Sequence, residues 1–272
     1  MKDLRVVIPA YNEEQGLGLT IDALRKACPE AEVLVVNDGS TDNTAQIAKE
    51  KGVVLVNCAS NYGYGHALKA GFAHDTGRKA NYLAFLDGDN TYPSSRLPEM
   101  YAAAKEHGFD LVIGSRLHGK SNGMEFTRRI GNTIFACLVL LCTRRFVSDT
   151  ASGLRVFRAE LAGDFQDLPN GLEFTPAMTT RALRRRYSYK EFPIEYSDRI
   201  GESKLRVFKD GFRFLKAIMN ETRKHDSSTV HPHGDLPSTD RPSLDANSGE
   251  RHLGIRLDLE EDHNQPPSGQ PE

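Results

Sequence analysis

The sequence predicts an α/β fold in which a mostly parallel central sheet is covered by helices on both faces. Three observations predict it. Short apolar segments alternate with segments of helical periodicity from Leu4 to Ile113. The apolar segments are nearly continuous rather than alternating, as expected of strands that are buried on both faces. The helical segments supply the crossover connections that parallel strands require.

The first elements are defined by apolar runs and by helical spacing. The apolar run Leu4–Ile8 predicts a strand that Pro9 ends, because proline cannot donate to a ladder. Residues 13–28 carry leucine and isoleucine at helical spacing, and the valine-rich residues 32–37 form the second strand. By the same two criteria we expect further helices at 41–51, 64–73 and 98–106, and further strands at 53–56, 82–86 and 111–113.

Composition indicates a globular protein. The 272 residues are 39% hydrophobic, enough for a sizeable core, and a net charge of −2 gives no indication of a nucleic acid partner. None of the four cysteines forms a C-x-x-C pair, which favours a reducing cytosol and no structural zinc. The chain runs directly into a strand without a signal peptide, and its longest apolar run, 134–142, is too short to span a bilayer. We therefore expect a cytoplasmic protein.

The chain divides by composition near residue 221. Residues 222–272 contain no aromatic residue and are rich in proline, serine and aspartate. Such a composition cannot bury enough apolar surface to fold. We expect one catalytic domain at 1–221, followed by a disordered polar tail at 222–272.

Polar residues follow each of the first four predicted strands. The four strand exits are Pro9–Glu14, Asn37–Asp42, Asn61–Ala67 and Asp87–Asp89. Because ligands of open α/β sheets bind at the carboxyl ends of the strands, these exits predict a nucleotide crevice. Asp38 could accept from a base or ribose, and Tyr11 could lie against the base. An ordinary turn with a helix cap is the alternative for the second exit.

Two aspartates, Asp87 and Asp89, leave the fourth strand one residue apart. Two carboxylates on a tight turn suit a hard divalent cation that keeps room for a diphosphate. An EF-hand is excluded, because Tyr92 and Pro98 stand where its glycine and closing glutamate are required. A surface turn is the alternative. The dinucleotide fingerprint is absent, since no predicted strand runs into G-x-G-x-x-G.

Taken in order, the motifs resemble a known family. Val7–Glu14, Asn37–Asp42 and Asp87–Asp89 are similar to the inverting glycosyltransferases of family two, which have the GT-A fold. Further segments resemble the dolichyl-phosphate mannose and glucose synthases, namely residues 114–116, 128–132, 149–155 and 199–205. Those enzymes transfer a sugar from a nucleotide diphosphate to a polyprenyl phosphate. The resemblance covers about residues 4–220.

The resemblance implies a metal-dependent hexosyltransferase that takes a GDP- or UDP-hexose and uses Mg²⁺ or Mn²⁺ held by Asp87 and Asp89. The residues implied for the donor site are Pro9, Tyr11, Glu13, Asp38, Gly65, Asp87, Gly88 and Asp89. Those implied for catalysis are Asp89, Arg116, Arg129, Asp149, Arg199 and Lys204.

The arginines suit a lipid phosphate acceptor. Such a phosphate is already an anionic nucleophile, so it needs cations to hold it. Bidentate contacts could come from Arg116, from Arg128 or Arg129, and from Arg199. A solvated surface charge is the alternative for each. Asp149 is similar in position to the general base of relatives with hydroxyl acceptors. With a phosphate acceptor we expect it to order the pocket instead, by orienting an arginine.

Two segments are candidates for membrane contact. Residues 130–142 are apolar and flanked by arginines, and residues 204–219 predict a basic amphipathic helix at the C-terminal end of the fold. Packing on the sheet with solvated bases is the alternative. The resemblance favours a peripheral protein on the cytoplasmic face of a membrane, where a separate subunit could supply an anchor.

Two other functions stay open. A transferase with a soluble hydroxyl acceptor would use Asp149 as base and would be active without lipid. A non-catalytic nucleotide-sugar-binding protein would bind donor and metal without turnover. The carboxylate pair and the arginines argue against the latter.

Overall fold

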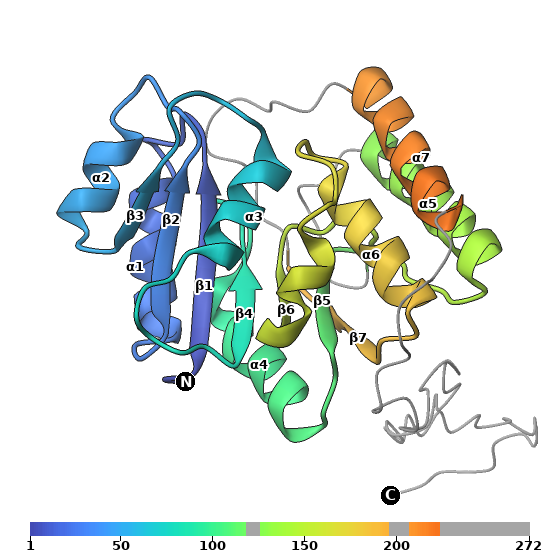
Figure 1. Cartoon of the computed structure of the whole chain (residues 1–272), viewed down its shortest axis with the longest axis horizontal. Helices are drawn as coiled ribbons and strands as arrows, with labels where there is room; N and C mark the ends of the chain where they lie inside the picture. The colour runs from blue at the N-terminus through green and yellow to red at the C-terminus, as the bar shows by residue number, and fades with distance from the viewer. Residues whose placement is uncertain (118–125, 196–206, 224–272) are drawn as a thin grey trace, which may run out of the picture. The chain divides into compact units, whose positions relative to one another are not determined.

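A computed structural model describes residues 1–117, 126–195 and 207–223 (Figure 1). Its strands are β1 (Leu4–Ala10), β2 (Glu32–Asn37), β3 (Val54–Asn57), β4 (Tyr82–Phe85), β5 (Leu111–Ser115), β6 (Arg155–Arg158) and β7 (Tyr189–Pro193). Its α-helices are α1 (Leu17–Ala27), α2 (Thr44–Glu50), α3 (Tyr64–Ala73), α4 (Leu97–Glu106), α5 (Phe126–Thr143), α6 (Phe174–Arg184) and α7 (Val207–Arg223). Short 3₁₀ helices form at η1 (Ser94–Arg96) and η2 (Ala159–Phe165). The expected tail lies almost wholly outside the described residues.

The described strands form one sheet in the order β3-β2-β1-β4-β6-β5-β7. Strand β1 is parallel to β2 and β4, β3 to β2, and β7 to β5, whereas β6 runs antiparallel to both β4 and β5. The expected mostly parallel sheet is therefore confirmed. The chain builds outward from β1 to β3 and then returns to place β4 on the other side of β1. That reversal creates a switch point at the carboxyl ends of β1 and β4, where ligands of such sheets bind.

Helices cover both faces of the sheet, as the sequence predicts. Along β1, Val6 and Ile8 pack into a core with apolar residues of α1, α2 and α4. Val7 points the other way, into a second core with apolar residues of α3, α5, α6 and α7. Figure 1 shows α3 and α6 over the near face of the sheet. Successive residues of a strand are thus buried in one core or the other, which explains why the strand sequences are continuously apolar.

The expectation that Pro9 ends the first strand is wrong, because β1 continues to Ala10 and Pro9 pairs in register with Val36 of β2. Pairing of β1 with β4 ends at Val7. Since Ala10 accepts from the backbone N–H of Asp38 on the β2 side, the missing N–H of Pro9 faces the β4 side, beyond the end of that ladder. The proline therefore removes no sheet hydrogen bond.

Helix α7 packs against α5 and α6, and it confirms the expected amphipathic helix. The Arg181 guanidinium of α6 donates to the buried Glu221 carboxylate at 2.7 Å, and the rings of Phe135 and Phe214 lie 5.4 Å apart. Glu221 therefore belongs to the folded domain, and the helix continues just past the boundary expected at 221. In the part of the chain that the structure describes, no helix combines the length and apolarity of a membrane span.

Candidate active site

The Asp87-Gly88-Asp89 turn lies at the switch point. Thr20 of α1 donates its hydroxyl to the Gly88 carbonyl at 3.2 Å, which connects this turn to the helix that follows β1. The Asp89 carboxylate is 3% exposed, and its Oδ1 accepts from the Thr91 hydroxyl at 2.6 Å and from the Thr91 N–H at 3.1 Å. These bonds fix the orientation of the Asp89 carboxylate.

The Asp87 carboxylate lies between an aromatic hydroxyl and a glycine. The Tyr64 hydroxyl of α3 donates to Asp87 Oδ1 at 2.8 Å. A Cβ on Gly153 would lie 2.7 Å from either oxygen of that carboxylate, so only glycine allows this approach. Burial, with the neighbouring Asp87 charge, holds the pKa of Tyr64 well above its ordinary value. Tyr64 therefore stays protonated and keeps donating to Asp87.

Asp87 and Asp89 fit the metal that the sequence predicts. Both side chains are carboxylates, the oxygen ligands that Mg²⁺ and Mn²⁺ prefer. Each is held by a hydroxyl group, one from Tyr64 and the other from Thr91. Outer hydrogen bonds of this kind orient metal ligands. These two residues are therefore the ones that would hold a divalent cation at the switch point.

The residues expected in the donor site gather at the same edge of the sheet. Asp38 is 2% exposed and accepts from the backbone N–H groups of Tyr62 at 3.0 Å and Gly63 at 2.8 Å. Pro9 lies in β1, and Tyr11 follows its end. The exits of β1, β2, β3 and β4 are thus brought together, as the parallel topology requires.

Two of the residues expected in the nucleotide-sugar donor site also make contacts that stabilise the fold. The backbone N–H of Glu13 donates to the Thr44 hydroxyl at 2.8 Å, which ties the exit of β1 to α2. Gly65 lies so close to the loop before α6 that a Cβ there would be 2.3 Å from the Pro169 carbonyl oxygen. A packing requirement alone accounts for this glycine.

Asp149 forms the centre of a second buried cluster. It is fully buried, and the Arg116 guanidinium donates to it from Nε at 2.7 Å and from Nη2 at 2.8 Å. Asn132 of α5 adds a third side-chain donor at 3.1 Å. Burial alone would raise the pKa of the Asp149 carboxyl, but the Arg116 charge and hydrogen bonds outweigh it and hold the pKa below its usual range. Asp149 is thus an ionised partner of Arg116.

Glu191 of β7 supports this cluster, and the sequence analysis missed it. Its carboxylate accepts from the Ser148 hydroxyl at 2.6 Å and from the backbone N–H groups of Ser148 at 2.9 Å and Asp149 at 3.1 Å. Glu191 therefore fixes the backbone that presents Asp149. A single acid within a strand carries no local signal for such a role.

Arg155 ends the segment 149–155 that resembles the family motif, and it is fully buried. It donates to the carbonyl groups of Ser152 at 3.1 Å and Thr150 at 2.7 Å, while its Nη1 has no hydrogen-bond partner among the described residues. Burial lowers its pKa to about 10, against the raising influence of Asp149 and Tyr64. Arg155 thus places a positive charge near Asp149 and near Tyr64, the residue that donates to Asp87.

Of the other expected cations, only Arg129 lies within the described residues. Arg129 lies near the start of α5 with an exposed side chain. Arg199 and Lys204 lie outside the described residues. The structure therefore associates Arg116 with Asp149 and leaves the placement of Arg199 and Lys204 as predictions.

Comparison with known proteins identifies the family. The family model "Glycosyl transferase family 2" matches residues 5–192. The chain is 36% identical over 220 residues to the dolichyl-phosphate hexose transferase of Haloferax volcanii, covering 80% of this chain and 92% of that protein. It is 31% identical over 222 residues to the low-salt glycan biosynthesis hexosyltransferase Agl6 of the same organism, covering 79% of this chain but only 53% of that protein.

The fold is also shared with a solved structure. Glucosyl-3-phosphoglycerate synthase from Mycobacterium tuberculosis, crystallised with Mn²⁺, UDP and glucosyl-3-phosphoglycerate, superimposes with a TM-score of 0.62 at 20% identity. The match covers 82% of this chain and 81% of that one. Together with the family match, this likeness confirms the GT-A-type fold. The chain belongs to glycosyl transferase family 2.

Proposed function

We propose that this protein transfers a hexose, mannose or glucose, from a nucleotide diphosphate sugar to the phosphate of a polyprenyl phosphate. One observation carries the choice of acceptor. Asp149 is fully buried and bound to Arg116 through two side-chain hydrogen bonds. A hydroxyl acceptor would require a base at this position, whereas a phosphate acceptor requires none. The similarity to a dolichyl-phosphate hexose transferase supports the same choice.

The donor would bind across the switch point. Asp38 and Tyr11 would contact the base of GDP or UDP, and Asp87 and Asp89 would hold Mg²⁺ or Mn²⁺ beside the diphosphate. The bound metal would supply Lewis-acid neutralisation of the departing diphosphate. Tyr64 and Thr91 keep the two carboxylates oriented for that task.

The reaction inverts the anomeric carbon. An oxygen of the lipid phosphate forms the new bond to that carbon as the bond to the nucleotide diphosphate breaks on the opposite side. The electron pair of the broken bond leaves with the diphosphate. Four cations would hold the attacking phosphate in line, namely Arg116, Arg129, Arg199 and Lys204. The planar fork of a guanidinium can contact two phosphate oxygens at once, and the lysine ammonium adds a positive charge.

Helix α5 would bring the acceptor side to a membrane surface. Its exposed side chains Ile130, Ile134, Cys137 and Leu141 are spaced three or four residues apart and form one stripe, here called the α5 stripe. Asn132, on the same helix, donates to Asp149 in the site. An apolar stripe that begins beside the active site suits a lipid acceptor whose phosphate lies at a bilayer surface.

Helix α7 carries further exposed apolar side chains. Phe212 is 69% exposed and Leu215 41% exposed, while Arg213 and Lys216 are exposed beside them. Because α5 and α7 pack against each other through Phe135 and Phe214, their outward faces belong to one unit. We infer a peripheral, salt-sensitive attachment to the cytoplasmic face of a membrane, to which a separate anchoring subunit could add. The folded catalytic domain then comprises about residues 1–221, with the tail outside it.

A label-transfer assay tests the proposal. Purified protein is given Mg²⁺ or Mn²⁺, polyprenyl phosphate in detergent, and in turn radiolabelled GDP-mannose, GDP-glucose, UDP-glucose and UDP-mannose. Label from one of these donors should enter the organic phase only when both lipid and metal are present. Donor binding without transfer from any of the four would indicate the non-catalytic alternative and contradict the proposal.

A further inference from the structure

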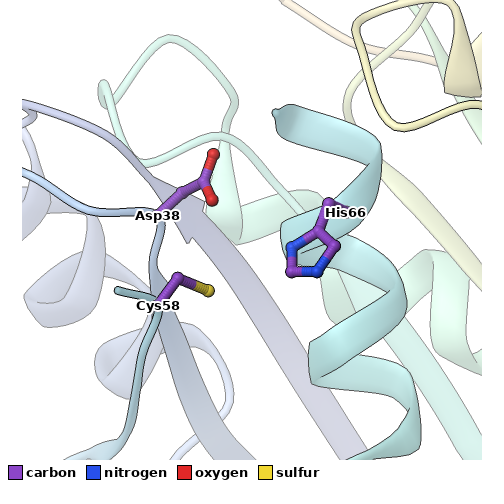
Figure 2. A group of neighbouring side chains, drawn as sticks. All are labelled: Asp38, Cys58 and His66. Carbon is purple, nitrogen blue, oxygen red and sulfur yellow. The ribbon is translucent and has the colours of Figure 1, made fainter. Parts of the chain in front are cut away.

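Three potential metal ligands of different chemistry meet beside the donor edge of the sheet. Asp38 follows β2, Cys58 follows β3, and His66 lies in the first turns of α3. One ligand atom from each of the three lies within 4.8 Å of the other two. Figure 2 shows the imidazole of His66 facing the carboxylate of Asp38 and the sulfur of Cys58. This group, here called the Asp-Cys-His cluster, is distinct from the Asp87 and Asp89 pair.

The surroundings of the cluster hold each ligand in place. The Asp38 carboxylate accepts two backbone N–H groups. The backbone N–H of Cys58 donates to the Asn37 carbonyl at 2.9 Å, which fixes the cysteine next to Asp38. The rings of His66 and Tyr62 lie 4.8 Å apart at an angle of 46°. Ligands supported in this way need little rearrangement to bind a metal.

His66 supplies a second, independent observation. Its Nδ1 is buried and has no hydrogen-bond partner among the described residues. A buried polar atom without a partner is unusual in a folded protein and calls for an explanation. A ligand that the structure does not contain, bound at this ring, would satisfy the imidazole.

We propose that the Asp-Cys-His cluster is a binding site for a zinc-class divalent cation. Thiolate and imidazole ligands favour Zn²⁺, whereas the all-oxygen pair Asp87 and Asp89 favours Mg²⁺ or Mn²⁺. Three protein ligands leave the fourth tetrahedral position open, as in zinc sites that are not purely structural. Ligand atoms in a tetrahedral zinc site are roughly 3.5 Å apart, so small rotations of the Cys58 and His66 side chains would close the cluster.

The binding step balances in charge and protons. The Cys58 thiol releases its proton to solvent, and the thiolate and the Asp38 carboxylate together neutralise the cation. His66 binds as neutral imidazole. No electron transfer and no second reactant are involved.

A metal at this position would also control access of the donor. Asp38 is the residue proposed to contact the donor base, so a cation held by Asp38 would compete with the donor. This part of the inference rests on the proposed function. We expect Zn²⁺ at low concentration to inhibit transfer, and excess nucleotide sugar to relieve the inhibition.

Binding is tested on the full chain without any activity assay. Cobalt(II) is added as a spectroscopic probe, and zinc is titrated in competition with a chromophoric chelator, both with Mg²⁺ in excess. We expect a thiolate-to-cobalt charge-transfer band that zinc abolishes. Cys58→Ser should remove the band, and both Cys58→Ser and His66→Gln should weaken zinc binding by about 100-fold or more, since loss of outer partners alone costs about 10–100-fold.

Cys142→Ser is the matched control, because this half-buried thiol of α5 lies outside the cluster. The control should bind cobalt and zinc as the parent chain does, and circular dichroism should show all three variants folded. An unchanged cobalt band in Cys58→Ser, or no zinc binding by the folded parent chain, would overturn the site. An inactive preparation that still binds zinc through Cys58 would refute the proposed function and leave the site standing. Zinc inhibition that survives in active Cys58→Ser would refute the competition with donor.

Discussion

The Arg116 guanidinium binds the Asp149 carboxylate through two side-chain hydrogen bonds, while the backbone N–H of Arg116 donates a third at 3.0 Å. Asp149 is fully buried, and the Arg116 side chain is 14% exposed. The pair joins the end of β5 to the loop before β6 and lies against α5 through Asn132. The pair therefore fixes the arrangement of the chain around Asp149 and keeps the Asp149 carboxyl ionised.

Asp149→Asn should lower the free energy of unfolding by about 3 kcal/mol, because it leaves the Arg116 charge without its buried partner. The matched control is Asp167→Asn, which breaks an arginine pair whose aspartate is 65% exposed and should cost less than about 1 kcal/mol. Denaturant unfolding at pH 7 measures both. Equal losses in the two variants would contradict the importance assigned to burial.

The stability difference between the parent chain and Asp149→Asn should depend on pH. The pKa of Asp149 is lower in the folded than in the unfolded chain, so its contribution is full above the unfolded-state value of about 3.9 and is lost as the pH falls through the folded-state value. Unfolding measured between pH 7 and pH 3 should show the gap narrowing only at the acid end. A gap that stays constant over this range would mean that folding does not shift the pKa of Asp149, and a gap that widens toward pH 3 would mean that Asp149 is protonated in the folded chain.

Asp89→Asn should reduce transfer by about a hundredfold or more while leaving the fold intact. Asparagine keeps the oxygen that accepts from Thr91 but removes the charge that would hold the metal, whose contribution is worth several kcal/mol. Turnover is measured over a titration of Mg²⁺ and Mn²⁺. The control is Asp22→Asn on α1, which breaks a surface ion pair with Lys51 and should keep parental turnover. Full turnover of Asp89→Asn in the presence of chelator would exclude the metal assignment.

Tyr64→Phe should weaken metal binding by about 10–100-fold, because Asp87 loses the hydroxyl that orients it. Turnover at saturating metal should recover, which separates an orienting role from a direct one. Tyr189→Phe removes a hydroxyl that donates to the Phe146 carbonyl at 2.6 Å, away from the carboxylates, and serves as the control. Electron paramagnetic resonance measures the Mn²⁺ affinity of each variant. Equal affinities in the parent chain and Tyr64→Phe would show that the Tyr64 hydroxyl does not support metal binding.

Replacing two residues of the α5 stripe, Ile134→Ser with Leu141→Ser, should weaken binding to anionic liposomes by tenfold or more. Each buried aliphatic side chain contributes roughly 1.5–3 kcal/mol, and the neighbouring bases add a term that falls with salt. Leu19→Ser changes a residue of similar exposure on α1, against the opposite face of the sheet, and should have no effect. Co-sedimentation at low and high salt measures the change. Parental binding by the double variant would exclude the stripe as the membrane contact.

Much of the donor side could be predicted from the sequence for a topological reason. Continuous apolar strands imply a parallel sheet, and a parallel sheet brings its strand exits together at one edge. Asp38 is therefore brought to the same edge of the sheet as Asp87 and Asp89, although it lies far from them in the sequence. The bounds of α3 and β2 also follow closely from periodicity and apolar runs.

The acceptor side could be predicted only in part. Strand β6 runs antiparallel between β4 and β5, a placement decided by tertiary packing rather than by its short sequence. The carboxylate of Glu191 accepts hydrogen bonds from Ser148 and Asp149, which lie far from it in the sequence. No local sequence pattern predicts such a contact. The ordering role expected of Asp149 agrees with its contact to Arg116, but the catalytic roles of both residues stay predictions.

An acceptor exchange distinguishes a phosphate acceptor from a hydroxyl acceptor. Purified protein with metal and its preferred labelled nucleotide sugar is offered polyprenyl phosphate, the matching polyprenol without phosphate, or a soluble hydroxyl acceptor. We expect label to enter the organic phase with polyprenyl phosphate alone, as a sugar phosphodiester of inverted configuration. Transfer to the polyprenol or to the soluble hydroxyl acceptor, without transfer to polyprenyl phosphate, would contradict the proposed phosphate acceptor. It would instead support the alternative in which Asp149 acts as a general base.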